Sequence, residues 1–98
     1  MTAKILGLAV QKLSSAGASM RCSEMAKLLQ SLGFEVRDGS RGGHKIFVHD
    51  HIQGFTTGAY NCDHGRNPEI KRPYIKKVLT ILRLYEAELN RYLEERND

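Results

Sequence analysis

Gly42-Gly43-His44-Lys45-Ile46-Phe47-Val48-His49 places a histidine between a glycine pair and an apolar run of strand length. Glycine has no Cβ, so another backbone or a phosphate can approach this turn closely. Imidazole, with an ordinary pKa of about 6.5, accepts and releases protons near neutral pH. The stretch predicts a strand over residues 44–49 and makes His44 a candidate catalytic residue, although a histidine that only begins a strand is the commoner case.

The flanking segments complete a predicted three-stranded antiparallel sheet. Alternating or β-type residues bounded by turn residues predict strands over residues 34–37, 44–49 and 55–62. Gly58 weakens the third strand. If the second turn is centred on residues 52–53, His44 pairs with Asn61 or a residue beside it, and the loop of residues 62–67 lies close by. This register gathers polar side chains at one end of the sheet.

Helical spacing of apolar residues predicts three helices around this sheet. They are expected over residues 3–14, over residues 22–32 and from Arg72-Pro73 onward. The expected apolar face of the first helix includes Ile5, Leu8, Ala9 and Leu13. The expected apolar face of the last consists of Ile75, Val78, Leu79, Leu82, Tyr85, Leu89 and Tyr92. Gly33 is placed to cap the second helix. A final helix of about twenty residues spans about 30 Å. We expect its second half to overhang the sheet and to pack on the first helix or on a second copy of the protein.

Charge is unevenly distributed along the 98 residues, which suffice for one domain. Residues 1–85 hold 13 Lys and Arg against 6 Asp and Glu, a balance of +7, and residues 86–98 hold 2 against 5, a balance of −3. A basic body attracts polyanions, of which nucleic acid is the commonest. Charge of this size also serves solubility alone.

The cysteines and the apolar segments predict a reduced, cytoplasmic protein. Cys22 and Cys62 are too few for a disulfide framework and do not form a Cys-x-x-Cys pair. The apolar run of residues 5–10 is too short for a signal peptide and is followed by Gln11 and Lys12. No stretch approaches the ~20 apolar residues of a membrane helix.

Helix, strand, strand, strand and helix from residue 20 onward are the layout of an α+β fold like the double-stranded-RNA-binding domain. Within it, Ser23-Glu24-Met25-Ala26-Lys27-Leu28-Leu29-Gln30-Ser31-Leu32-Gly33-Phe34, the Gly42–His49 stretch quoted above and Pro68-Glu69-Ile70-Lys71-Arg72-Pro73-Tyr74-Ile75-Lys76-Lys77-Val78-Leu79 resemble the HicA family of toxins. The resemblance covers roughly residues 20–85. It suggests a HicA-like domain over residues 20–98 and an N-terminal helical extension over residues 1–19.

The resemblance implies an endonuclease that cleaves mRNA without the ribosome and is held in check by a HicB-like antitoxin. The family's catalytic histidine, on its second strand, corresponds to His44. One departure is Gly43, which stands where the family has Ser or Thr and removes a side chain that could hydrogen-bond near a phosphate. A second is the presence of residues 1–19 and an extended C-terminus, which lie outside the common pattern.

RNA cleavage without metal needs a base for the ribose 2′-hydroxyl, an acid for the leaving oxygen and positive charge near the phosphate. His44 is the candidate base, and either His64 or water is the acid. Candidate RNA contacts are Arg41, Gly42, Gly43, Lys45, Arg66 and Lys71, since cations and exposed backbone position phosphate without reading sequence. No cofactor is expected.

Several of these residues also suit other roles. His49, His51, Cys62 and His64 are a reasonable zinc set by type, but the predicted register puts His49 at the opposite end of the sheet from Cys62, so no metal is expected. Tyr60 suits anchoring of the sheet better than stacking on a base. Alternatives to the nuclease are a non-catalytic RNA-binding module and an adaptor protein that forms a homodimer through the final helix.

Overall fold

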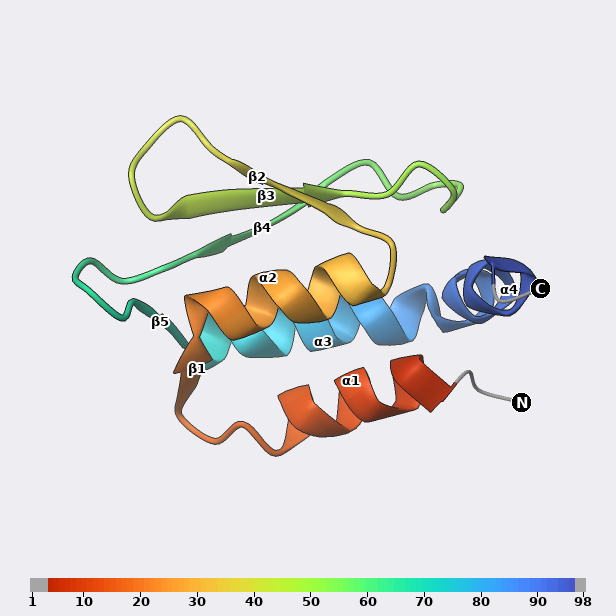
Figure 1. The fold of residues 1–98 in the computed structure, drawn as a ribbon, viewed down its shortest axis with the longest axis horizontal. Coiled ribbons are helices and arrows are strands. Elements are labelled where there is room, and N and C mark those ends of the chain that lie inside the picture. The colour runs from red at the N-terminus through yellow and green to blue at the C-terminus, as the bar shows by residue number, and fades with distance from the viewer. Residues whose placement is uncertain (1–3, 97–98) are drawn as a thin grey trace.

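The computed structural model describes residues 4–96, in which four helices and five strands form. The helices are α1 (Lys4–Ser14), α2 (Cys22–Ser31), α3 (Arg72–Leu84) and α4 (Glu86–Arg96). The strands are β1 (Ser19–Arg21), β2 (Glu35–Asp38), β3 (His44–Val48), β4 (Gly58–Asn61) and β5 (Glu69–Lys71). In Figure 1 the sheet of β2, β3 and β4 lies above α2 and α3, and α1 lies beneath them. The order α2-β2-β3-β4-α3 confirms the α+β, double-stranded-RNA-binding-like fold with an added N-terminal helix.

The main sheet has the predicted antiparallel order β2-β3-β4, and its register places His44 opposite Asn61. The third strand is shorter than expected, since it begins at Gly58 and not at residue 55. The sheet requires glycine at position 58, because a Cβ there would lie 2.2 Å from Cζ of Phe47. The large apolar ring of β3 therefore fills the space that Gly58 leaves on β4.

A second, two-stranded sheet pairs β1 with β5 and was not predicted. Each strand has only three residues, too few to show a period along the sequence. The pair joins the starts of α2 and α3, and the Cys22 N–H donates to the Pro68 carbonyl at 2.9 Å. This small sheet fixes the segment after β4 against the helical layer.

The buried face of α1 differs by one position from the expected one. Leu6, Ala9 and Leu13 are buried, whereas Leu8, predicted to face the core, is 57% exposed. The i, i+3, i+7 spacing of the buried set follows one side of a helix that packs on α3. The predicted start at residue 3 lies outside the described residues.

The expected single C-terminal helix is two helices, because the chain turns at Tyr85 between α3 and α4. No proline or glycine marks this point. The Tyr85 ring packs edge-on to Phe55 at 5.5 Å, and its hydroxyl donates to the Gly54 carbonyl at 3.2 Å. In Figure 1 α4 points along the line of sight while α3 lies across it. The turn buries Leu89 and Leu93 completely, so the apolar stripe is covered within the chain and does not overhang.

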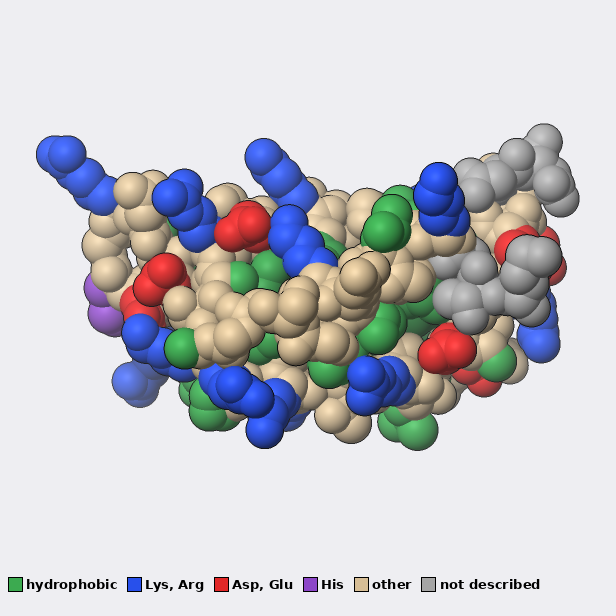
Figure 2. All heavy atoms as spheres, turned by 90° about the horizontal axis from the view of Figure 1, so that it is seen from below, with side chains coloured by type: hydrophobic (Ala, Val, Ile, Leu, Met, Phe, Trp, Pro, Cys, Tyr) green, Lys and Arg blue, Asp and Glu red, His purple; other side chains and the backbone are tan. Residues whose placement is uncertain are grey.

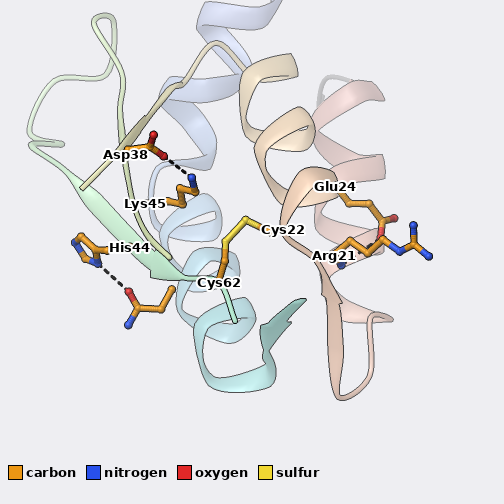
Figure 3. The surroundings of a disulfide bond; sticks show 8 residues. Arg21, Cys22, Glu24, Asp38, His44, Lys45 and Cys62 are labelled. Carbon is orange, nitrogen blue, oxygen red and sulfur yellow. Dashed lines mark hydrogen bonds and ion pairs between the residues drawn. A yellow bond between two sulfur atoms is a disulfide. The ribbon is translucent and has the colours of Figure 1, made fainter. Parts of the chain in front are cut away.

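The prediction that the two cysteines stay reduced is wrong for this structure, in which Cys22 and Cys62 form a disulfide. Their Cα atoms lie 5.7 Å apart, although 40 positions separate them along the chain. The bond joins the start of α2 to the residue after β4, and Figure 3 shows it on the far side of β3 from the His44 ring. Within residues 4–96 no helix has the length and apolar character needed to cross a bilayer.

Candidate active site

His44 stands at the first position of β3, where the glycine turn enters the sheet. Its ring is half-buried, and Nδ1 lies 2.8 Å from Oδ1 of Asn61, the residue opposite it on β4. The amide of Asn61 continues the chain of contacts, since its Nδ2 donates to the Tyr74 hydroxyl at 2.8 Å. The dashed line from His44 in Figure 3 marks the first of these bonds. Strand pairing and the first turn of α3 together orient the imidazole.

Two glycines make room for this arrangement. A Cβ at Gly39 would lie 2.1 Å from Cδ2 of His44, so the imidazole occupies the place of a side chain there. A Cβ at Gly43 would lie 2.1 Å from the Cys62 carbonyl oxygen, and the Gly43 carbonyl accepts the Cys62 N–H at 2.7 Å. Position 43 therefore requires glycine, because the Cys62 carbonyl occupies the place of a side chain there.

A cavity of about 400 Å³ opens beside the ring. It is lined by residues 40–44, Asn61, Cys62 and His64. The glycine turn and the loop after β4 form its walls, so the two segments predicted to meet at this end of the sheet do meet. His64, the candidate acid, is exposed at this cavity. Such an open pocket admits a polar chain to the imidazole.

The predicted cations divide into those at the pocket and those outside it. Arg41 is exposed and lines the pocket. Lys45 pairs with Asp38, the residue opposite it on β2. Successive residues of a strand point to opposite faces, so Lys45 lies on the other face of the sheet from His44. Lys71 pairs with Asp63 at 3.2 Å, and Arg66 is exposed on the loop after β4, outside the pocket lining. The structure thus brings one of the four predicted cations to the pocket.

Positive charge is also present far from the pocket. Figure 2, which views the face carrying α1, shows Lys and Arg side chains around its rim with apolar side chains between them. Part of this charge is paired within the protein, as in the 3.2 Å contact of Lys12 with Glu24. The body of the molecule presents a general attraction for polyanions in addition to any local site.

The residues of the rejected zinc set are separated. Cys62 is in the disulfide, and the buried His49 lies beyond the other end of β3. Within residues 4–96 no group of three or more His, Cys, Asp or Glu side chains is placed to hold a metal ion. Tyr60 is completely buried, which confirms its anchoring role, and burial raises the pKa of its phenol to about 12.

Sequence reasoning missed three residues of the site. Asn61 was placed opposite His44 by the register but was given no role, although an amide facing an imidazole was a usable signal. Gly39 and Tyr74 had no such signal. Gly39 is one of several glycines in the turn of residues 38–43, and Tyr74 lies on a helix 30 positions after His44. Only folding brings these side chains to the ring.

The fold and site together define a small α+β domain of the double-stranded-RNA-binding type with an accessible histidine at one end of its sheet. A family model described as the HicA toxin of bacterial toxin-antitoxin systems matches residues 22–84, more than half of the chain. The chain belongs to the HicA toxin family. It is therefore the toxin of a toxin–antitoxin pair, and its partner is an antitoxin. Comparisons with curated proteins and with solved structures gave no match.

Proposed function

We propose that this toxin is an endoribonuclease that cleaves mRNA by metal-independent general acid–base chemistry, with His44 as the base. One observation carries the proposal: the His44 ring lines an open pocket while Nδ1 is hydrogen-bonded to Asn61, so Nε2 is the nitrogen proposed to meet the substrate. A general base must lie within hydrogen-bond reach of the proton that it removes. A ribose that enters the pocket can meet this requirement.

In the proposed step Nε2 of His44 removes the proton from a ribose 2′-hydroxyl. The 2′-oxygen forms a bond to the adjacent phosphorus as the bond from phosphorus to the 5′-oxygen of the next nucleotide breaks. His64 or water gives a proton to that leaving oxygen. The products are a 2′,3′-cyclic phosphate and a 5′-hydroxyl, and the protons balance because one is taken up and one is released.

The phosphate is proposed to bind where positive charge and exposed backbone meet. Arg41 supplies the charge at the pocket, and the N–H groups of Gly42 and Gly43 supply close backbone contacts. Arg66 and Lys71 are proposed to contact the RNA backbone away from the cleaved bond. Lys45 contributes least in this scheme, because it pairs with Asp38.

A HicB-like antitoxin is proposed to neutralise the toxin, and the cytoplasm is the proposed location because mRNA is found there. Residues 20–98 are proposed as the functional unit and residues 1–19 as an extension; the family match over residues 22–84 lies within that unit, and α1 packs on α3. Thiol reductants of the cytoplasm would act on the disulfide between Cys22 and Cys62. Both residues are buried, which slows that exchange.

A non-catalytic RNA-binding module of the same fold is the second candidate. It is favoured by the Lys and Arg side chains around the rim of the face that carries α1, away from the pocket (Figure 2). Domains of this type bind duplex RNA by shape and phosphate contacts. Such a module would bind RNA with a steep salt dependence and would return it intact.

The test is cleavage of single-stranded RNA by the purified chain in the presence of EDTA. His44→Ala should lower the rate about 10²- to 10⁴-fold, which is the usual contribution of a positioned base. His51→Ala is the matched control, since His51 is an exposed histidine beyond the other end of β3. Expression of the wild type, and not of His44→Ala, should arrest growth and degrade transcripts.

Several results would overturn the proposal. Equal cleavage or equal toxicity of His44→Ala would remove His44 as the base. Loss of cleavage on chelation, restored by a divalent cation, would contradict the metal-independent mechanism. Intact RNA with salt-dependent binding, equal in wild type and His44→Ala, would establish the second candidate.

A further inference from the structure

We propose that Asn61 is a positioning residue that fixes the tautomer of His44, and that Tyr74 holds the Asn61 side chain beside the imidazole. The inference rests on the proposed function, since it explains how the base is prepared for its substrate. The juxtaposition that carries it is the chain of two hydrogen bonds from His44 through Asn61 to Tyr74, each 2.8 Å long.

The three side chains come from three elements that fold together at this end of the sheet. His44 and Asn61 are directly opposed on β3 and β4, and Tyr74 lies in the first turn of α3. The next backbone contact reinforces the register, since the Cys62 N–H donates to the Gly43 carbonyl at 2.7 Å. The Asn61 backbone is thereby held against β3, and its side chain has a defined distance to the imidazole.

The chemistry of the two partners determines where the proton on His44 lies. A neutral imidazole carries one N–H, on either Nδ1 or Nε2, and an amide oxygen can only accept a hydrogen bond. Because Oδ1 of Asn61 faces Nδ1, the proton belongs on Nδ1 and the lone pair is on Nε2. The nitrogen toward the substrate is then the one that can take a proton.

Tyr74 is the second partner of the Asn61 amide. An asparagine amide presents a donor at one end and an acceptor at the other, and rotation by half a turn exchanges them. In the structure the Tyr74 hydroxyl accepts from Nδ2, and the oxygen is directed at His44. Because a phenol hydroxyl can donate as well as accept, Tyr74 holds the amide beside the ring and does not by itself select this orientation. In the opposite orientation Nδ2 would donate to Nδ1, which would put the imidazole proton on Nε2 and remove the base from the pocket.

This network contributes to the site more than to the stability of the fold. Asn61 is exposed and both hydrogen bonds lie at the surface, where water replaces a lost partner at small cost. Substitutions at Asn61 and Tyr74 that retain the backbone should therefore fold. A role in positioning can be separated from a structural role by observing the ring nitrogens themselves.

The first experiment records the ¹⁵N shifts of the histidine ring nitrogens in the full-length protein above neutral pH, assigned with His44→Ala. The wild type should show the proton of His44 on Nδ1, and Asn61→Ala should lose this preference. A wild-type ring protonated on Nε2, or a tautomer unchanged in Asn61→Ala, would overturn the inference. This readout does not depend on RNA cleavage.

The second experiment measures steady-state cleavage. Asn61→Ala should lower kcat about 10- to 100-fold, less than loss of the base itself, with little change in KM. Asn61→Asp should recover most of kcat, because a carboxylate accepts from Nδ1 and the Tyr74 hydroxyl can donate to it. Tyr74→Phe should lower kcat by a smaller factor than Asn61→Ala.

Matched controls make the same chemical changes elsewhere. Asn67→Ala removes an exposed asparagine outside the pocket lining, and Tyr85→Phe removes a hydroxyl that bonds to the Gly54 carbonyl at 3.2 Å. Both should cleave like the wild type. If His44→Ala remains active, the proposed function fails while the ring shifts still test the tautomer. If His44→Ala is inactive and Asn61→Ala is fully active, the positioning role alone is refuted.

Discussion

The two ends of β3 carry the same side chain in opposite surroundings. His44 begins the strand, lines an open pocket and meets the exposed amide of Asn61. His49 follows the last residue of the strand, is only 6% exposed, and lies edge-on to the rings of Phe34 and Tyr92 at 4.8 and 4.6 Å. Two histidines five positions apart thus have different uses, because the fold packs different partners around each ring.

Hydrogen bonding sharpens the contrast. Nε2 of His49 donates to the Leu32 carbonyl at 3.0 Å, and its Nδ1 accepts the His51 N–H at 3.1 Å. Backbone groups thus hydrogen-bond to both ring nitrogens, one as acceptor and one as donor, and this arrangement favours the neutral ring. At the other end the side chain of Asn61 occupies one nitrogen of His44, and the pocket lies open beside the ring. One histidine is arranged for structure and the other for chemistry.

The largest expected effect concerns the disulfide, which braces the His44 end. Reduction, or replacement of Cys22 and Cys62 by alanine, should lower the free energy of unfolding by about 4 kcal/mol, given their sequence separation of 40. Denaturant titration measures this, and hydrogen exchange should increase more at Cys62 than at His49. An equal increase at both residues would mean that the bond stabilises the whole fold and not one end.

The next test compares the effects on stability of replacing each histidine by alanine. His49→Ala should lower the free energy of unfolding by about 3 kcal/mol, since it leaves a cavity and an unpaired Leu32 carbonyl. His44→Ala should change it by less than about 1 kcal/mol. Thermal denaturation of the two variants checks this directly. A larger stability loss in His44→Ala would contradict the division between structure and chemistry.

The glycine pair offers a smaller, closely matched comparison. Gly43→Ala should lower the free energy of unfolding by about 2 kcal/mol, because the new Cβ would overlap the Cys62 carbonyl at 2.1 Å. Gly42→Ala should leave it nearly unchanged, since a Cβ there meets only Cε1 of His64, at 3.9 Å. Chemical denaturation of both variants measures the difference. Equal stabilities would show that β3 and Cys62 can separate freely.

The smallest effect is the pH dependence that His49 confers. Burial lowers its pKa below the ordinary 6.5, so the unfolded chain binds the proton first as the pH falls. The stabilisation is complete above pH 6.5 and is lost below it, by at most about 1.4 kcal/mol per pH unit. Denaturation between pH 5 and 7 measures the slope. His49→Phe should reduce this slope and His51→Phe should preserve it; the reverse would assign it to the exposed ring.

Prediction from the sequence worked best where a pattern is local. The alternation of residues 34–37 and the glycine turn before His44 predicted the strands, and the register placed Asn61 correctly. It did not indicate the ion pair of Lys45 with Asp38, which depends on the pairing of β2 with β3. The chain turn at Tyr85 carries no local signal at all, because contacts with Phe55 and Gly54 produce it.

Periodicity and turn chemistry, written into short stretches of sequence, determined the α+β class, the order of the main elements and the position of His44 at a strand start. The tertiary structure decided the rest: the disulfide of Cys22 with Cys62, the pairing of β1 with β5, and the contacts from His44 through Asn61 to Tyr74. The physical reason is the distance along the chain over which each interaction acts. Backbone preferences depend on neighbouring residues, whereas a bond or a ring contact depends on residues that only packing brings together.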